Sequence, residues 1–169
     1  MPRSLSRKRS PKGFTVVETV MTAAILALLA LIIAPLFLHG TRFFLLNRTR
    51  VELQRDARAC LGILTRNLRE AASATLVIDQ VNGQPYYSRV TFTDINGNNY
   101  VYYQNGNSLM EVKGTKTTVL TDDLRFLNFY FPRSNDMTIV SVSLTLEKAI
   151  FEGRTKALHV ATEKVRVMD

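Results

Sequence analysis

The chain has 169 residues, with 22 Lys and Arg against 14 Asp and Glu, so its formal net charge is +8. Five of the basic residues fall within residues 1–13, and the remaining 17 against 14 leave +3, so the charge is weak evidence for a nucleic-acid partner. A single cysteine excludes a disulfide framework within the chain.

Residues 1–13 form a short basic leader. They contain no acidic residue, end at Gly13 and carry five positive charges: Arg3, Arg7, Lys8, Arg9 and Lys12. Because the cytoplasmic flanks of membrane segments are enriched in Lys and Arg, we expect this leader to stay in the cytoplasm. Everything after residue 38 is then expected on the other side of the membrane.

Residues 14–38 form an apolar segment of membrane length. Thr19 to Leu38 contains no charged residue. The 25 residues that begin at Phe14 would extend about 37 Å as a helix, which exceeds the ~30 Å hydrocarbon core of a bilayer. We therefore expect one transmembrane helix here.

Glu18 lies inside this segment, near its cytoplasmic edge. An unpaired carboxylate there costs roughly 2.5–3.5 kcal/mol or more, so we infer that Glu18 has a partner. A secretory signal peptide does not fit, because its apolar core spans only about 7–15 residues and no small-residue cleavage site follows residue 38. An ordinary signal-anchor helix would explain the length and orientation but neither Glu18 nor the Gly13-Phe14 pair.

Residues 39–75 are expected to continue the helix in amphipathic form. Apolar residues recur there at helical spacing, with charged residues on the other faces and no proline between 41 and 75. The apolar stripe consists of Leu53, Ala57, Leu61, Leu64, Leu68 and Ala72. This stripe predicts that the second half of the helix packs on a globular head.

Residues 76–169 are expected to form that head, and it should be rich in β-structure. Short alternating runs separated by Asn/Gly turns are typical of antiparallel sheets. We expect strands near 76–78, 86–93, 100–103 (continuing in a hairpin through 110), 117–120, 124–131, 138–146 and 157–167. The predicted fold class is α+β, with a long N-terminal helix packed on one sheet or on two packed sheets.

Residues 12–18, Lys-Gly-Phe-Thr-Val-Val-Glu, resemble the class III signal of prepilins, the precursors of type IV pilins and type II secretion pseudopilins. The resemblance implies that a prepilin peptidase cuts between Gly13 and Phe14 and that Phe14 is then N-methylated. It also implies that Glu18, the fifth residue of the mature chain, acts in subunit recruitment and assembly. Pro35 falls where many pilins carry a helix-kinking proline.

The same resemblance implies where the protein resides and what it contacts. The mature chain would cross the bacterial inner membrane once, with a periplasmic head, and later enter a filament. Its partners would be other pilin-like subunits, the prepilin peptidase and the inner-membrane assembly platform.

The soluble part resembles J-type minor pseudopilins and W-type minor pilins. The resemblance rests on residues 53–58 and 66–71 of the helix and on the apolar and turn pattern of 102–109 and 124–131. It implies a minor subunit that primes or joins a type II secretion pseudopilus or a type IV pilus. Two alternatives stay open: a DNA-uptake or adhesive minor pilin, and a plain signal-anchored extracytoplasmic domain.

The DNA-uptake alternative depends on arginines and tyrosines. Seven arginines lie between Arg42 and Arg69, and tyrosines at 86, 87, 100, 102 and 103 could offer stacking surfaces. The competing interpretation is that the arginines are solvated or paired with acidic neighbours and that the tyrosines fill the sheet. The second interpretation is favoured, so a nucleic-acid partner is not expected.

We expect no enzyme activity, cofactor or metal site. His39 and His159 lack metal-ligand spacing, and the adjacent Asp122 and Asp123 would point to opposite faces of a strand, so they are interpreted as a turn. The stretch 94–99 resembles a calcium loop but lacks the required glycine and glutamate, and a plain turn is favoured.

Cys60 lies beside Leu61 within the predicted helix. Free cysteine behaves as a small hydrophobic residue when it is buried, so we expect it in the core. A reactive or intermolecular thiol is the alternative.

Overall fold

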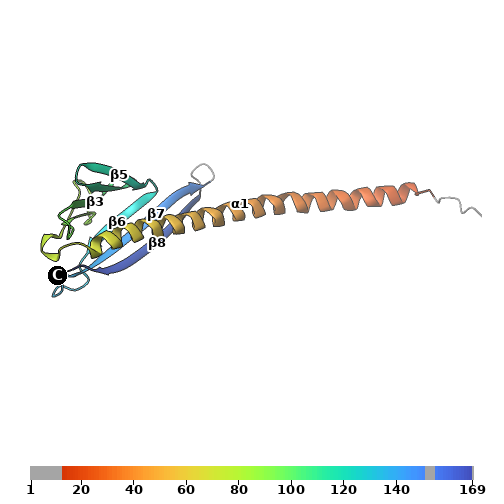
Figure 1. The fold of residues 1–169 in the computed structure, drawn as a ribbon. Helices are drawn as coiled ribbons and strands as arrows, with labels where there is room; N and C mark the ends of the chain where they lie inside the picture. The colour runs from red at the N-terminus through yellow and green to blue at the C-terminus, as the bar shows by residue number, and fades with distance from the viewer. Residues whose placement is uncertain (1–12, 151–154, 169) are drawn as a thin grey trace, which may run out of the picture. The chain divides into compact units, whose positions relative to one another are not determined.

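The structure is a computed structural model that describes residues 13–150 and 155–168. Within these residues the chain forms one long α-helix, one short 3-10 helix and eight strands, so the fold is α+β as expected (Figure 1). The chain divides into two compact units, of which the first ends at Phe44 and the second begins at Leu45.

Helix α1 runs from Val16 to Arg69, and its first part, up to Phe44, belongs to the first unit. The side chains of residues 14–33 and 35–44 are all exposed, including large apolar ones such as Phe37, which is 75% exposed. Pro35 lies inside the helix. This part of α1 is long and apolar enough to cross a membrane.

The part of α1 in the second unit is amphipathic. The predicted stripe is buried from Leu53 to Leu68, each leucine at 6% exposure or less. Cys60 joins this stripe at 3% exposure, which confirms its expected place in the core.

The helix ends at Arg69, earlier than the predicted residue 75. The reason is tertiary pairing: the Ala72 N–H donates to Thr93 O at 3.0 Å and the Ser73 N–H to Met168 O at 3.0 Å. These bonds hold Ala72 in an extended conformation, and a 3-10 turn, η1 (Ser73–Thr75), follows. Local periodicity cannot reveal such distant partners.

Five strands form an antiparallel sheet in the order β1-β2-β3-β4-β5. Tight two-residue loops join β3 to β4 and β4 to β5, with Gly106 and Gly114 both at φ +57°, a conformation that favours glycine. The strands are β1 (Val77–Asp79), β2 (Arg89–Thr93), β3 (Asn99–Asn105), β4 (Ser108–Lys113) and β5 (Lys116–Thr121).

Strand β2 begins at Arg89, three residues after the expected start at Tyr86. The Tyr86 ring packs on Phe126 at a centroid distance of 4.5 Å, and the Tyr87 carbonyl accepts the Phe129 N–H at 2.8 Å. Residues 86–87 therefore bind the other sheet instead of extending β2.

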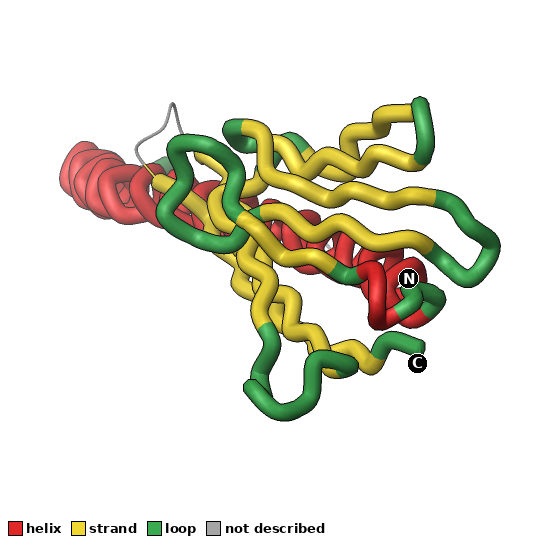
Figure 2. The backbone as a smooth tube through the Cα atoms, turned by 90° about the vertical axis from the view of Figure 1, so that its left-hand side faces the viewer, coloured by secondary structure: helices red, strands yellow, loops and turns green. Residues whose placement is uncertain are grey.

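A second antiparallel sheet has the order β6-β7-β8, formed by β6 (Leu124–Tyr130), β7 (Ile139–Ile150) and β8 (Thr155–Arg166). Strand β7 is longer than the predicted 138–146, because Lys148, Ala149 and Ile150 pair with the start of β8. Figure 2 draws the strands of the two sheets in yellow beside the red helix, which is seen nearly end-on.

One hydrophobic core joins both sheets to the second half of α1. Its largest fully buried side chains include Phe92 and Tyr102 of the five-stranded sheet, Phe129 and Leu144 of the three-stranded sheet, and Leu64 of the helix. At about 25 cal/mol per Å² of buried apolar surface, this shared core is the main stabilising contribution to the second unit.

Gln104 links the two sheets through its side chain. It is 4% exposed; its amide accepts the Leu127 N–H at 3.0 Å and donates to Gly106 O at 2.9 Å and Arg125 O at 3.4 Å. The amide group thus occupies the place that a neighbouring strand would take beside β6.

Candidate functional site

The candidate site is the start of α1, where Gly13, Phe14 and Glu18 lie in sequence. Gly13 and Phe14 precede the helix, and Phe14 is 76% exposed. A Cβ placed on Gly13 would meet no atom within 4 Å. An exposed pair of residues outside the helix is compatible with cleavage between residues 13 and 14. The leader residues Arg7, Lys8, Arg9 and Lys12 lie outside the described residues.

Glu18 sits in the first turn of α1. Its backbone N–H donates to Thr15 Oγ1 at 3.3 Å, so Thr15 caps the helix. Its carboxylate forms no ion pair or hydrogen bond within the described part of the chain. A negative charge at a helix N-terminus gains about 0.3–1 kcal/mol from the helix dipole, less than the cost of placing it in lipid.

Sequence reasoning missed the capping role of Thr15. The signal was present, because Thr15 and Glu18 stand at the spacing of a capping box, Thr-x-x-Glu. The cap fixes where α1 begins and places the Glu18 carboxylate on the first turn, close in sequence to Phe14.

Hydroxyl groups near Glu18 are satisfied within the helix itself. Thr19 Oγ1 donates to Val16 O at 2.8 Å, and Thr22 Oγ1 donates to Glu18 O at 3.0 Å. Glu18 is the only ionisable side chain in the apolar segment 14–38. It is therefore the side chain of this segment that most needs a partner.

Comparisons with protein-family models, curated proteins and solved structures found no match to this chain.

The other candidate residues lie in separate surroundings. Asp122 and Asp123 lie in the bend before β6, as predicted, and turn to different partners: Ser108 Oγ donates to Asp122 at 2.7 Å, and Lys148 Nζ is 3.5 Å from Asp123. His39 is exposed in the first unit and His159 half-buried on β8. Residues 13–150 and 155–168 contain no cluster of three His, Cys, Asp or Glu that could hold a metal ion.

The Asp94 loop is the plain turn that the sequence favours. The Asp94 carboxylate accepts the backbone N–H groups of Asn96 and Asn98 and the Asn98 side-chain amide, each at 2.8 Å. The side-chain hydrogen bond from Asn98 is the main cause that lowers the Asp94 pKa, and the backbone N–H groups add to it.

Cys60 has the properties of a core residue. Burial, with a smaller contribution from the Asp56 charge, raises its pKa to about 11. The thiol is therefore protonated at neutral pH, which disfavours a reactive role.

The tyrosines are divided between core and surface. Tyr100 and Tyr102 are 5% and 0% exposed and fill the five-stranded sheet, so they offer no stacking surface, whereas Tyr87 is 52% exposed. The Tyr102 hydroxyl donates to Glu111 and accepts from Asn67 of α1 at 2.6 Å. Burial, together with the Glu111 hydrogen bond, raises the Tyr102 pKa.

Proposed function

We propose that this chain is a minor pilin-like structural subunit. A prepilin peptidase cleaves it after Gly13 and methylates the Phe14 amine, and the mature chain then primes or joins a type II secretion pseudopilus or a type IV pilus. Its role is structural and not enzymatic, and it requires no cofactor. It crosses the bacterial inner membrane once, with the head in the periplasm, before it enters the filament.

One combination of features carries the proposal. An accessible Gly13-Phe14 pair precedes the first part of α1, where the side chains of residues 14–33 and 35–44 are exposed, and a single carboxylate, Glu18, lies in the first turn. Such a helix is stable in lipid or against other apolar helices. A membrane anchor alone would not retain Glu18.

The mechanism follows from charge. Cleavage removes five basic residues that hold the N-terminus in the cytoplasm and frees the Phe14 amine. That amine pairs with Glu18 of a neighbouring subunit, so two groups that are costly to bury alone neutralise each other. Desolvation offsets much of the electrostatic gain, so the pair contributes register and recruitment more than net stability. Apolar packing of segments 14–38 supplies most of the cohesion.

The direct test of this mechanism is Glu18→Ala. We expect the variant to insert and to be cleaved normally, because the apolar segment and Gly13 are unchanged, but to be absent from filaments purified from cells that lack the wild-type chain. Glu18→Gln should behave in the same way, since it removes the charge and keeps the size. Thr22→Ala, another polar position in the same helix, is the matched control and should assemble. Normal assembly of both Glu18 variants would contradict the recruiting role.

A further inference from the structure

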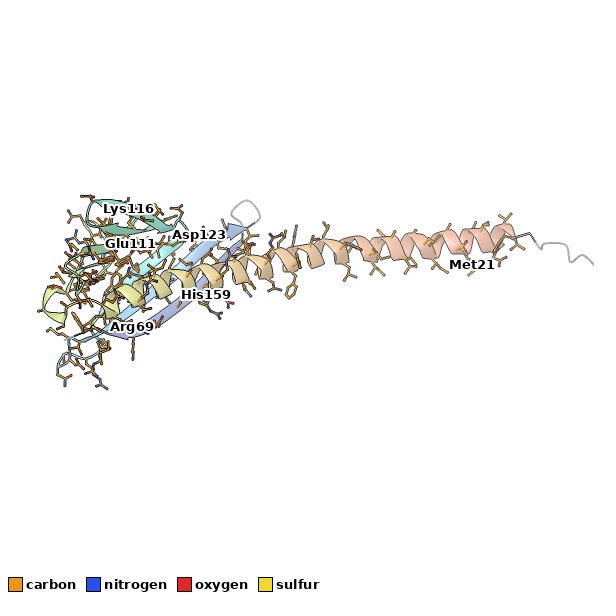
Figure 3. All side chains as sticks on the ribbon, viewed as in Figure 1. Met21, Arg69, Glu111, Lys116, Asp123 and His159 are labelled. Carbon is orange, nitrogen blue, oxygen red and sulfur yellow. The ribbon has the colours of Figure 1, made fainter. Side chains whose placement is uncertain are left out.

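The surface of α1 that faces away from the core of the second unit is dominated by arginine. Arg55, Arg58, Arg66 and Arg69 are all exposed. At about 100° per residue they fall within about 80° of one another around the helix axis, opposite the buried stripe. We call these four residues, with Ala59 and Gly62 between them, the arginine face. Figure 3 labels Arg69 near the end of the helix.

The positive charge of the arginine face is only partly balanced within the described residues. Arg55 is 3.6 Å from Asp56, with its side chain 80% exposed. Arg58, Arg66 and Arg69 form no ion pair or side-chain hydrogen bond with any residue that the structure describes. By contrast, both lysines at the β7–β8 hairpin, Lys148 and Lys156, are paired with carboxylates.

Adjacent like charges weaken a free helix. Arg55 and Arg58 are three residues apart, as are Arg66 and Arg69, and like charges at close helical spacing destabilise a helix by about 0.2–0.5 kcal/mol per pair. The face therefore gains most when an external partner supplies negative charge.

The middle of the arginine face is flat. Ala59 and Gly62 lie between the two arginine pairs, and a Cβ built on Gly62 would meet no atom within 4 Å. Glycine inside a helix costs about 1 kcal/mol relative to alanine, but it lets a second helix approach closely, at about 8–10 Å between axes. The two arginine pairs are eleven residues apart, or about 16 Å along the axis.

We propose that the arginine face binds an acidic α-helix of a partner protein. The partner backbone lies over Ala59 and Gly62, and its carboxylates bind the Arg55–Arg58 and Arg66–Arg69 pairs through the bidentate geometry that guanidinium groups favour. The inference rests on the proposed function only in that a filament subunit has neighbouring subunits whose helices run beside its own.

The flanking charges favour a protein over a nucleic acid. Glu52 and Asp56 lie along one edge of the arginine face, about 60–100° around the helix from Arg55, with side chains 38% and 39% exposed. They would repel a phosphate backbone that covers the whole face, whereas a partner helix with its carboxylates in one row meets the arginines and not this edge. The face also contains no aromatic residue on which a base could stack.

The test uses the full chain in detergent micelles and a labelled synthetic peptide. The peptide is an Ala-rich helix of about 25 residues, with two Glu pairs at i, i+3 spacing placed eleven residues apart and alanine between them. Fluorescence anisotropy measures binding to the wild-type chain, to the double variant Arg58→Glu/Arg66→Glu and to a matched control, Arg133→Glu/Lys116→Glu, whose residues are exposed and far from α1 in sequence.

We expect the peptide to bind the wild type and the control within twofold of each other, and Arg58→Glu/Arg66→Glu about tenfold or more weakly. A peptide with Arg in place of Glu should bind Arg58→Glu/Arg66→Glu and not the wild type. Equal binding of the peptide by the wild type, the double variant and the control would overturn the proposal. So would wild-type binding of a second peptide, with the same charges scrambled around its axis, as strong as that of the designed peptide.

Two further probes test other occupants. Stronger binding of a short DNA duplex, or of phosphatidylglycerol vesicles, that is lost in Arg58→Glu/Arg66→Glu would overturn the proposal in favour of phosphate recognition. Peptide binding can be measured on the chain with or without its leader. A failure of the chain to bind the peptide is therefore distinguishable from a failure of the proposed processing. Far-UV circular dichroism confirms that the variants remain helical.

Discussion

Replacement of Gln104 by leucine should destabilise the second unit by about 1–3 kcal/mol. Leucine fills a similar volume but leaves the Leu127 N–H without its acceptor, and Leu127 is fully buried. A buried unsatisfied N–H costs about 1–3 kcal/mol. The Gly106 and Arg125 carbonyls also lose a donor, but both residues are exposed, so water can replace it. For a unit of this size the expected loss in Tm is roughly 5–15 °C.

Thermal unfolding of the full chain in micelles measures this effect. The protein has six tyrosines and no tryptophan, so near-UV circular dichroism reports on packed rings such as Tyr100 and Tyr102. Gln54→Leu makes the same chemical change at an exposed position of α1 and should shift stability by less than about 0.5 kcal/mol. If Gln104→Leu destabilised the protein no more than Gln54→Leu, Gln104 would not be the link between the two sheets.

Two further predictions follow from the pKa values. Because the Cys60 pKa is about 11, about one thiol in a thousand is ionised at pH 8. A thiol reagent should therefore label the native chain far more slowly than the denatured chain. Equal labelling rates would contradict the burial of Cys60. The Asp94 pKa is lower in the folded chain than in the unfolded chain, so the stabilisation it provides is complete above about pH 4 and is lost as pH falls through the folded value. Asp94→Asn should therefore be less stable at neutral pH and lose less stability between about pH 4 and pH 2 in urea titrations; parallel pH profiles would refute this role.

The spacing of apolar and turn residues alone predicted the buried face of α1 and the positions of the turns. Leu53, Leu61, Leu64 and Leu68 recur at helical spacing because one face of α1 must be buried, and all four are in the core. The Asn/Gly turns at Gly97 and Gly106 likewise marked where the chain reverses between antiparallel strands.

Features fixed by distant residues could not be predicted in this way. The helix ends at Arg69 because Ala72 pairs with Thr93 and Ser73 with Met168. In the sequence Gln104 looks like an ordinary polar strand residue, yet its side-chain oxygen accepts a hydrogen bond from the Leu127 N–H, 23 residues away. No local pattern encodes either contact.

The candidate site could be proposed from the sequence alone, for a physical reason. Membrane insertion and the proposed cleavage would both depend on a linear stretch, Gly13 to Glu18 and the apolar residues that follow. Such a stretch can be recognised in a sequence without knowledge of the fold. The arginine face could not be defined from sequence alone, because it required knowing which side of α1 the core covers.

The most direct test of the central claim is the intact mass of the membrane-extracted protein, from cells with and without an active prepilin peptidase. The account predicts that, with the peptidase, the chain loses residues 1–13 and gains one methyl group on Phe14, whereas without it the full 169-residue chain remains. Gly13→Leu should stay unprocessed in both. A wild-type chain that keeps its leader in cells whose peptidase processes another substrate would contradict the account and leave a plain signal-anchored domain.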